Sequence, residues 1–186
     1  MNASRQTAID VSGIAMHLVL RLFFLLMLLP GIASGSNTSG LDEGCSEPLS
    51  TEETTNKLWL VNLSGIGVIT AWGVLNWDYF SKPPGTTSEG WFGNDTNYGG
   101  ADKLGHLYTS YVTAHGLSYL YESWCIDRDD AALYGALSSL AIVGYMEIGD
   151  SFSGFGFSSE DMLANTVGVV AGYYSYKYPS IGHYVD

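Results

Sequence analysis

The most prominent pattern in the sequence is an uncharged, mainly apolar stretch at 58–77, between Lys57 and Asp78. As a helix, about 20 residues extend over roughly 30 Å, which matches the hydrocarbon core of a bilayer. Asn62 and Ser64 lie within the stretch and are unusual for a helix that faces lipid. The pattern therefore predicts either a membrane-embedded helix or the buried helix of a soluble bundle.

Three further segments have the mixture of apolar and small residues that packed helices show, and they are expected near 101–123, 130–149 and 159–178. Acidic residues from Asp127 onward supply a cap for the second, and Pro179 ends the third. The expected fold is all-α, an antiparallel bundle of about four helices. Small residues recur four positions apart, a spacing that lets helix backbones approach closely: Ala131, Gly135, Ser139, Ala164, Gly168 and Gly172.

The first 35 residues have the organisation of a secretory signal peptide. Arg21 precedes a short apolar run at 22–29, which turn-forming and small residues follow. Such a run is too short to span a membrane, so it predicts a cleaved signal peptide at 1–35. The next residues, 36–55, are rich in Ser, Thr, Gly and acid and predict a flexible acidic tether, with the helical domain at 56–186.

The chain has two cysteines, Cys45 and Cys125. In an exported protein they are expected to form a disulfide, because compartments outside the cytoplasm are oxidising. The alternative is two unpaired thiols. A disulfide would place both cysteines on one side of any membrane, which requires either no crossing or two crossings between them. The expected location is the periplasm or an envelope membrane.

The formal net charge is −12, from 19 acidic and 7 basic residues. A surface with this excess of negative charge repels phosphate backbones, so nucleic-acid binding is excluded. The expected partners are membrane lipids, with an envelope protein as a second candidate.

Ionisable and amide side chains gather at three of the expected helix ends. An Asp and a His one turn apart open the segment at 101–123, a Glu lies near the end of 130–149, and an Asp and an Asn open 159–178. If consecutive helices run antiparallel, these three ends meet in space. The candidate catalytic residues are Asp102, His106, Glu147 and Asp161; the candidate binding residues are Lys103, Asp150 and Asn165.

On a helix, Asp102, His106, Thr109 and Thr113 share one narrow stripe, whereas Lys103 points elsewhere. The preferred role of the cluster is structural or partner-binding, through mutually satisfied hydrogen bonds. The alternative is an envelope enzyme that acts on a lipid or cell-wall substrate, with the histidine as general acid or base. The pattern calls for no cofactor, and a metal ion bound by the histidine and the three candidate catalytic carboxylates is a third option.

The motifs of the cluster resemble a known family. Gly-Gly-Ala-Asp-Lys-Leu-Gly-His at 99–106, a later Glu and Asp, and Gly-Phe-Ser-x-Glu-Asp-Met-Leu-Ala-Asn at 156–165 are similar to the YfiM-type predicted periplasmic lipoproteins. More distantly, the pattern resembles the VanZ-like superfamily. The resemblance covers roughly 89–175 and implies a small helical envelope protein without an established activity. The chain departs from the family pattern because it lacks a lipobox before Cys45 and adds the apolar stretch at 58–77.

Overall fold

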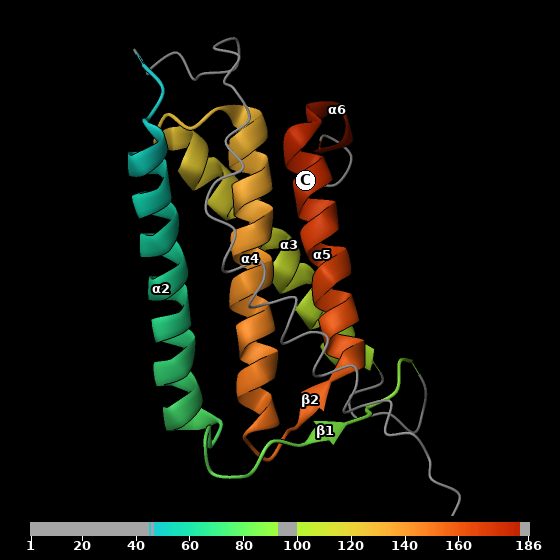
Figure 1. Ribbon diagram of the computed structural model, residues 1–186. Coiled ribbons are helices and arrows are strands. Elements are labelled where there is room, and N and C mark those ends of the chain that lie inside the picture. Colours follow the sequence, from blue (N-terminus) through green and yellow to red (C-terminus); the bar gives the residue numbers. More distant parts are fainter. Residues whose placement is uncertain (1–44, 46, 93–99, 183–186) are drawn as a thin grey trace, which may run out of the picture.

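The computed structural model describes residues 45, 47–92 and 100–182. Over these residues the chain forms four long helices that lie alongside one another (Figure 1), which confirms the predicted all-α class. Successive helices alternate in direction, so that α2 and α4 run down the view of Figure 1 and α3 and α5 run up it. The predicted signal peptide lies outside the described residues. The helices are α2 (Thr51–Asn76), α3 (Ala101–Ser123), α4 (Arg128–Ser151) and α5 (Ser159–Lys177).

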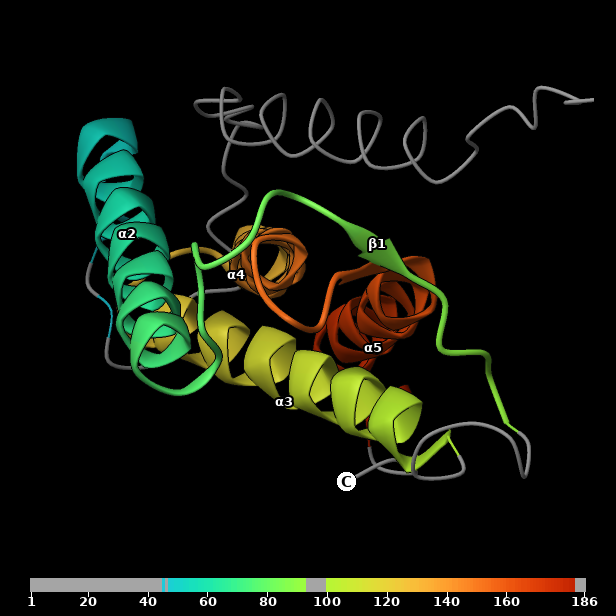
Figure 2. The same ribbon diagram turned by 90° about the horizontal axis from the view of Figure 1, so that it is seen from below.

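Two short strands and one short helix complete the described fold. β1 (Thr86–Thr87) follows α2 and pairs in parallel with β2 (Phe157–Ser158), which directly precedes α5. Figure 2 shows the segment that carries β1 running from the end of α2 past α4 and α5. A strand of two residues is too short to show an alternating pattern of apolar and polar residues, so neither strand was among the predicted elements. α6 (Pro179–Gly182) follows α5.

α2 begins at Thr51, earlier than the predicted Leu58, because a polar capping box stabilises an earlier start. The Ser50 hydroxyl accepts a hydrogen bond from the backbone N–H of Glu53 at 3.3 Å, and the Glu53 carboxylate accepts one from the backbone N–H of Ser50 at 3.1 Å. This arrangement satisfies two N–H groups that a helix start otherwise leaves unpaired. The predicted tether at 36–55 is therefore too long, since its last residues are helical.

The caps of the other helices follow simple chemistry. Asp127 caps α4 by accepting a hydrogen bond from the Asp129 N–H at 2.9 Å, and Ser158 caps α5 through the Asp161 N–H at 3.2 Å. α3 has no side-chain cap and starts after Gly100, whose φ of 85° lies in the left-handed region that favours glycine. The cap of α3 therefore depends on backbone conformation alone.

α3 packs against both α4 and α5 with the helix backbones in close approach. Gly168 of α5 lies against the carbonyl group of Leu107 in α3, and Gly135 of α4 lies against the backbone of Ser118 in α3. A methyl group at either glycine would overlap the facing helix. The small residues that the sequence places four positions apart are all buried at these contacts, which confirms their predicted role.

Tyr79 joins the end of α2 to α4. Its ring lies between Gly73 of α2 and Gly149 of α4, where any side chain on either glycine would overlap it. Its hydroxyl donates a hydrogen bond to the carbonyl oxygen of Met146 at 3.0 Å. The aromatic ring thus fixes the lower end of α2, in the view of Figure 1, against the last turns of α4.

The rest of α2 exposes large apolar side chains. Val68 is 68% exposed and Leu75 is 80% exposed. Both α2 and α4 are long and apolar enough to cross a membrane, but 56% of the apolar window of α4 is buried in the bundle, against 6% for α2. Among the residues that the structure describes, α2 therefore lies on the outside of the bundle and is not buried within it.

A disulfide joins Cys45 to Cys125, as predicted. Cys45 precedes α2 and Cys125 lies in the turn between α3 and α4, so the bond ties the start of the bundle to its upper end in Figure 1. Two antiparallel helices, α2 and α3, separate the two cysteines. Both cysteines therefore lie at the same end of the bundle.

Replacing Gly168 with Ala tests the close approach of α5 to α3. We expect Gly168→Ala to lower the free energy of unfolding by about 1–3 kcal/mol, because the new methyl group meets the Leu107 carbonyl. The matched control is Gly116→Ala in α3, where nothing lies within 4 Å of the added methyl group. We expect the control to be neutral or stabilising by up to about 1 kcal/mol, because Ala is the better helix former. Chemical unfolding of both variants in detergent measures the difference, and equal shifts would contradict the packing.

Candidate functional site

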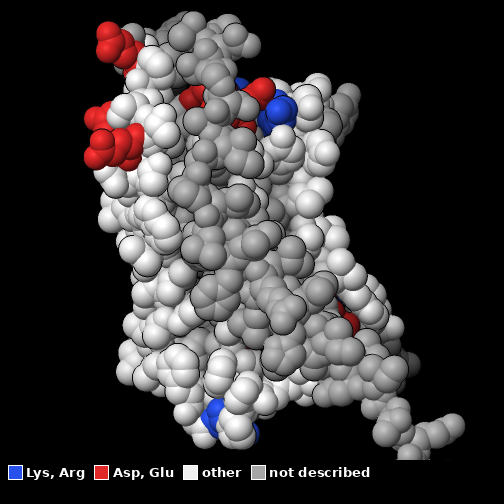
Figure 3. All heavy atoms as spheres, viewed as in Figure 1, with Lys and Arg blue, Asp and Glu red and all other residues white. Residues whose placement is uncertain are grey.

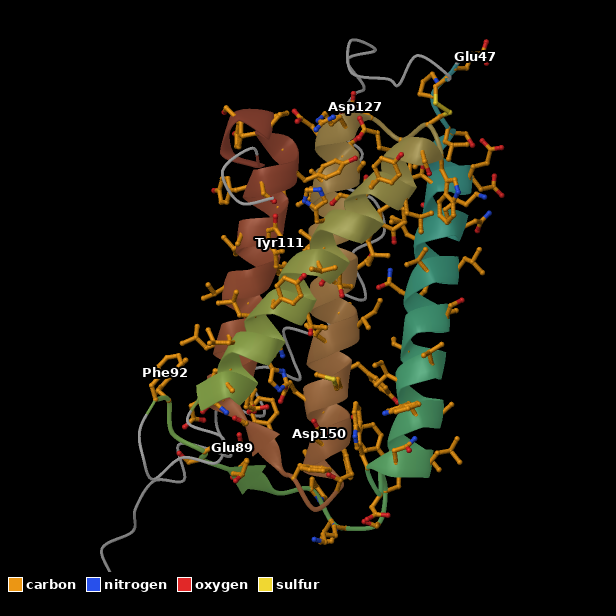
Figure 4. The ribbon with its side chains drawn as sticks, turned by 180° about the vertical axis from the view of Figure 1, so that it is seen from behind. Glu47, Glu89, Phe92, Tyr111, Asp127 and Asp150 are labelled. Atoms are coloured by element: carbon orange, nitrogen blue, oxygen red, sulfur yellow. A yellow bond between two sulfur atoms is a disulfide. The ribbon has the colours of Figure 1, made fainter. Side chains whose placement is uncertain are left out.

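The start of α3, the end of α4 and the start of α5 lie together at the lower end of the bundle in Figure 1, as the antiparallel arrangement predicts. Figure 4 labels Glu89 and Asp150 at this end. The seven candidate residues all come from these three helix ends. We refer to them, together with Glu89, as the polar cluster.

Lys103 is the buried cation of the polar cluster, with 4% of its side chain exposed. Its ammonium group lies 2.6 Å from Asp161 Oδ1, 2.7 Å from Glu89 Oε2 and 2.9 Å from Asp102 Oδ2. Burial by itself lowers the pKa of Lys103, but hydrogen bonds to the three carboxylates outweigh burial and raise the pKa. The side chain therefore stays charged and compensates part of the buried negative charge.

His106 lies at the centre of the polar cluster and separates two groups of partners. Its Nε2 atom faces Asp102 Oδ1 at 3.6 Å and Asp161 Oδ2 at 4.0 Å. Its Nδ1 atom lies 3.3 Å from Glu147 Oε1 and 3.3 Å from Asn165 Oδ1. The two nitrogen atoms of the ring therefore have different surroundings, with a pair of carboxylates on one side and a carboxylate and an amide on the other.

Asn165 connects the inner side of the polar cluster into a continuous network. Its amide nitrogen donates a hydrogen bond to Glu147 Oε1 at 3.0 Å, and its carbonyl oxygen accepts one from the Ser110 hydroxyl at 2.7 Å. Asn165 and Glu147 are each 1% exposed, and Ser110 is fully buried. Because each of these side chains has a partner, this part of the cluster holds a fixed geometry and orients the ring of His106.

A pocket with a volume of about 500 Å³ lies beside the polar cluster. Its apolar wall includes Ile69 and Trp77 of the α2 region and Ile142 and Met146 of α4. At its polar end lie the side chains of Asp102, His106, Asp150 and Asn165. Ligand pockets commonly have this size and this combination of an apolar wall with a few polar groups.

The predicted stripe on α3 is the part of that helix that lines the pocket. Thr109 and Thr113 continue the line of Asp102 and His106 along the wall. Glu147, Asp161 and Lys103 do not line the pocket; they lie behind the residues that do. The site thus consists of residues that line the pocket and of buried residues that hold them in place.

Asp150 closes the lower end of the pocket and lies next to Tyr79. Burial and the neighbouring carboxylate of Asp150 raise the pKa of the Tyr79 hydroxyl, which is therefore neutral. A neutral hydroxyl can donate a hydrogen bond. Tyr79 therefore packs against the end of α2 and also contacts the polar end of the pocket.

The seven candidate residues lie at one end of the bundle, as the sequence predicts, but neither Glu89 of the polar cluster nor the adjoining Ser110 was predicted. Lys103 lies off the stripe of α3 that lines the pocket, as expected, and its long side chain still reaches Asp102 at 2.9 Å. Glu89 was missed because it lies in a loop without periodicity. Ser110 was also missed, although its position one turn after His106 places it on a neighbouring face of the helix.

Comparison with known proteins adds a family to this geometry. Residues 88–177 match the model of a family described as predicted periplasmic lipoprotein (DUF2279). The match supports the resemblance to the YfiM-type family and gives no support to the more distant VanZ-like resemblance. It also agrees with the predicted export to the periplasm or an envelope membrane. No curated protein and no solved structure matches the chain.

The matched region contains α3, α4 and α5 and therefore the whole polar cluster. α2, which supplies Ile69 to the pocket, and Trp77, which directly follows α2, both lie before it. The polar cluster is thus part of the region shared with the family, whereas one wall of the pocket comes from outside that region.

Replacing Lys103 with Met tests the charge compensation. We expect Lys103→Met to lower the free energy of unfolding by about 3–5 kcal/mol, because it leaves buried carboxylates without their cation. Lys82→Met is the matched control, since Lys82 is an exposed lysine of the loop after α2. We expect the control to change stability by no more than about 0.5 kcal/mol. Unfolding curves of the two variants in detergent make the comparison, and a Lys103→Met protein as stable as the control would refute the role.

Proposed function

We propose that the protein is a bilayer-embedded component of the cell envelope that binds an amphiphilic molecule. The pocket takes the apolar chain of this molecule, and the polar cluster contacts its polar head. The observation that carries the proposal is the pocket itself, which is apolar along α2 and α4 and has its ionisable side chains at the end formed by Asp102, His106 and Asp150.

The distribution of charge supports a position in the bilayer. Residues 58–77, 104–121, 131–146 and 162–176 contain no Asp, Glu, Lys or Arg. As helices these stretches extend over roughly 22–30 Å, close to the thickness of a bilayer core. On the described part of the face in Figure 3, the charged atoms gather toward the upper and lower ends.

Exposed apolar side chains occur on all four long helices, which also supports contact with lipid. Soluble proteins rarely expose contiguous apolar surfaces of this extent. Water would oppose such exposure, whereas lipid chains would not. Representative side chains, each at least 37% exposed, are Leu63 and Val68 of α2, Val112 of α3, Leu137 of α4, and Val167 and Val170 of α5.

An acid–base role for His106 is a second candidate function. The ring lines the pocket, and the network of Glu147 and Asn165 holds its Nδ1 side. A bound head group would therefore meet an oriented imidazole beside the carboxylate of Asp102, as general acid–base chemistry requires. A purely structural role accounts for the inner network but leaves the pocket without a purpose.

Cysteine labelling tests the position in the bilayer. In opened membranes, where both faces are accessible, we expect a membrane-impermeant maleimide to modify Asn56→Cys but not Val68→Cys. Both side chains are exposed on α2, and only Val68 lies within the uncharged stretch. After solubilisation in denaturing detergent, both variants should react. Equal labelling of the two variants in the opened membranes, before solubilisation, would contradict the proposal.

Photolabelling tests the pocket. A monoacylglycerol with a diazirine in its acyl chain is added to the full chain in phosphatidylcholine nanodiscs. The mixture is irradiated, and the crosslinks are mapped by mass spectrometry. We expect crosslinks on the peptides that contain Ile69, Ile142 and Met146, because these side chains line the pocket.

A matched pair of variants separates the pocket from the outer surface of α3. Thr113→Trp fills the pocket, whereas Val112→Trp adds the same side chain at a neighbouring position that is 46% exposed. We expect labelling of the pocket peptides to fall severalfold in Thr113→Trp and to persist in Val112→Trp. Equal labelling of both variants, or crosslinks spread evenly over the lipid-facing surface, would refute a specific site.

A further inference from the structure

We infer that Asp102, His106 and Asp161 bind one divalent first-row transition metal ion, with Zn²⁺ as the ion that fits best. One ligand atom from each of the three residues lies within 4.8 Å of the other two. Imidazole and carboxylate ligands suit zinc and also manganese. This inference goes beyond the proposed binding of an amphiphile and does not depend on it.

In the carboxylates of Asp102 and Asp161, one oxygen contacts Lys103 and the other is positioned to bind a metal ion. Lys103 contacts Asp102 Oδ2 and Asp161 Oδ1, at 2.9 and 2.6 Å. The remaining oxygens, Asp102 Oδ1 and Asp161 Oδ2, both face His106 Nε2, at 3.6 and 4.0 Å. The ammonium group and the metal would therefore bind opposite edges of the two carboxylates and would not compete for the same atoms.

The two distances from His106 Nε2 to the aspartate oxygens are close to those between ligands of a metal site. Zinc binds nitrogen and oxygen ligands at about 2.0–2.2 Å, which places neighbouring ligand atoms roughly 3–3.5 Å apart. The observed 3.6 and 4.0 Å separations from His106 Nε2 exceed this range by a few tenths of an ångström. Small movements of Asp102 and Asp161 toward His106 would complete the coordination.

The inner network prepares the ring of His106 for metal binding. A proton on Nδ1 can be donated to Glu147 Oε1 or Asn165 Oδ1, each 3.3 Å away, and the lone pair then lies on Nε2, which faces the two aspartates. Metal-bound histidines almost always donate their other N–H to a carboxylate or carbonyl in this way. Glu147 would thus be a positioning residue for the metal ligand.

The balance of charge in the polar cluster also favours a cation. Lys103 is the lysine of the cluster, and its single positive charge faces three carboxylates: Glu89, Asp102 and Asp161. A divalent ion would offset much of the remaining negative charge. Asp102 and His106 line the pocket, so further coordination positions would be open to water or to the head group of a bound amphiphile.

Isothermal titration tests the inference on the full chain in maltoside detergent, after a chelator has removed bound metal. We expect Zn²⁺ to bind with a stoichiometry of one per chain and expect His106→Gln and Asp161→Asn each to weaken binding by more than about tenfold. His115→Gln is the matched control, because His115 lies farther along α3 and contacts Ser175, outside the cluster. The control should bind Zn²⁺ like the unmodified protein.

A third variant keeps the test decisive if loss of a ligand disturbs the fold. Glu147→Gln retains all three ligands and should weaken Zn²⁺ binding by about tenfold through the orientation of His106. Tighter binding of Mn²⁺ than of Zn²⁺, with the same dependence on the three ligands, would support the site with manganese as its ion. The inference would be overturned if neither Zn²⁺ nor Mn²⁺ binds, or if His106→Gln and His115→Gln bind Zn²⁺ equally well. Photolabelling with monoacylglycerol uses the metal-free protein, so the two proposals can fail separately.

Discussion

The close approach of α3 to α4 and α5 is the constraint on which the rest of the structure depends. Glycines at 135 and 168 bring the backbones of facing helices into contact, and the narrow interfaces leave little room for large apolar side chains. Small polar side chains take their place, as where the Ser139 hydroxyl donates to the Ser110 carbonyl at 3.1 Å. The same approach forces the ends of three helices together, along with the ionisable side chains they carry. Burying those groups is costly unless each finds a partner.

Lys103 supplies much of the required compensation. An ammonium group has three N–H donors, and here three carboxylate oxygens surround it. Because two of those carboxylates offer only one oxygen to Lys103, their other oxygens remain directed at His106. The position of one lysine therefore organises both sides of the cluster. Lys103 compensates part of the negative charge and leaves two carboxylate oxygens directed at His106, next to the pocket.

Much of this arrangement could be predicted from the sequence, because it follows from helical periodicity. The predicted segment at 101–123 coincides with α3, and the spacing of Asp102, His106, Thr109 and Thr113 identifies the stripe that lines the pocket. The antiparallel arrangement of successive helices brings Glu147 to the same end. These inferences succeed because they need only the rise and period of a helix and a simple up-and-down connection.

The features that sequence reasoning missed depend on geometry that has no period. The start of α2 is set by a polar capping box inside a segment whose composition resembles a tether. Glu89 reaches the cluster from a loop. Lys103 is a predicted member of the cluster, but its contacts with three carboxylates depend on a flexible side chain whose direction is not fixed by its place on the helix. The pocket was unpredictable for another reason, since its volume depends on how far α2 stands from α3.

α2 links the two proposed properties of the protein, contact with lipid and binding of an amphiphile. It lies outside the region that matches the periplasmic lipoprotein family, yet Ile69 and the neighbouring Trp77 form part of the pocket wall. Tyr79, held between two glycines, fixes its lower end to α4, while most of its outer surface remains apolar and exposed. If that outer surface faces lipid, the pocket lies one helix away from the bilayer. An amphiphile could then pass from the membrane into the pocket without its chain crossing water, and its head group would meet the polar cluster where the apolar stretches end.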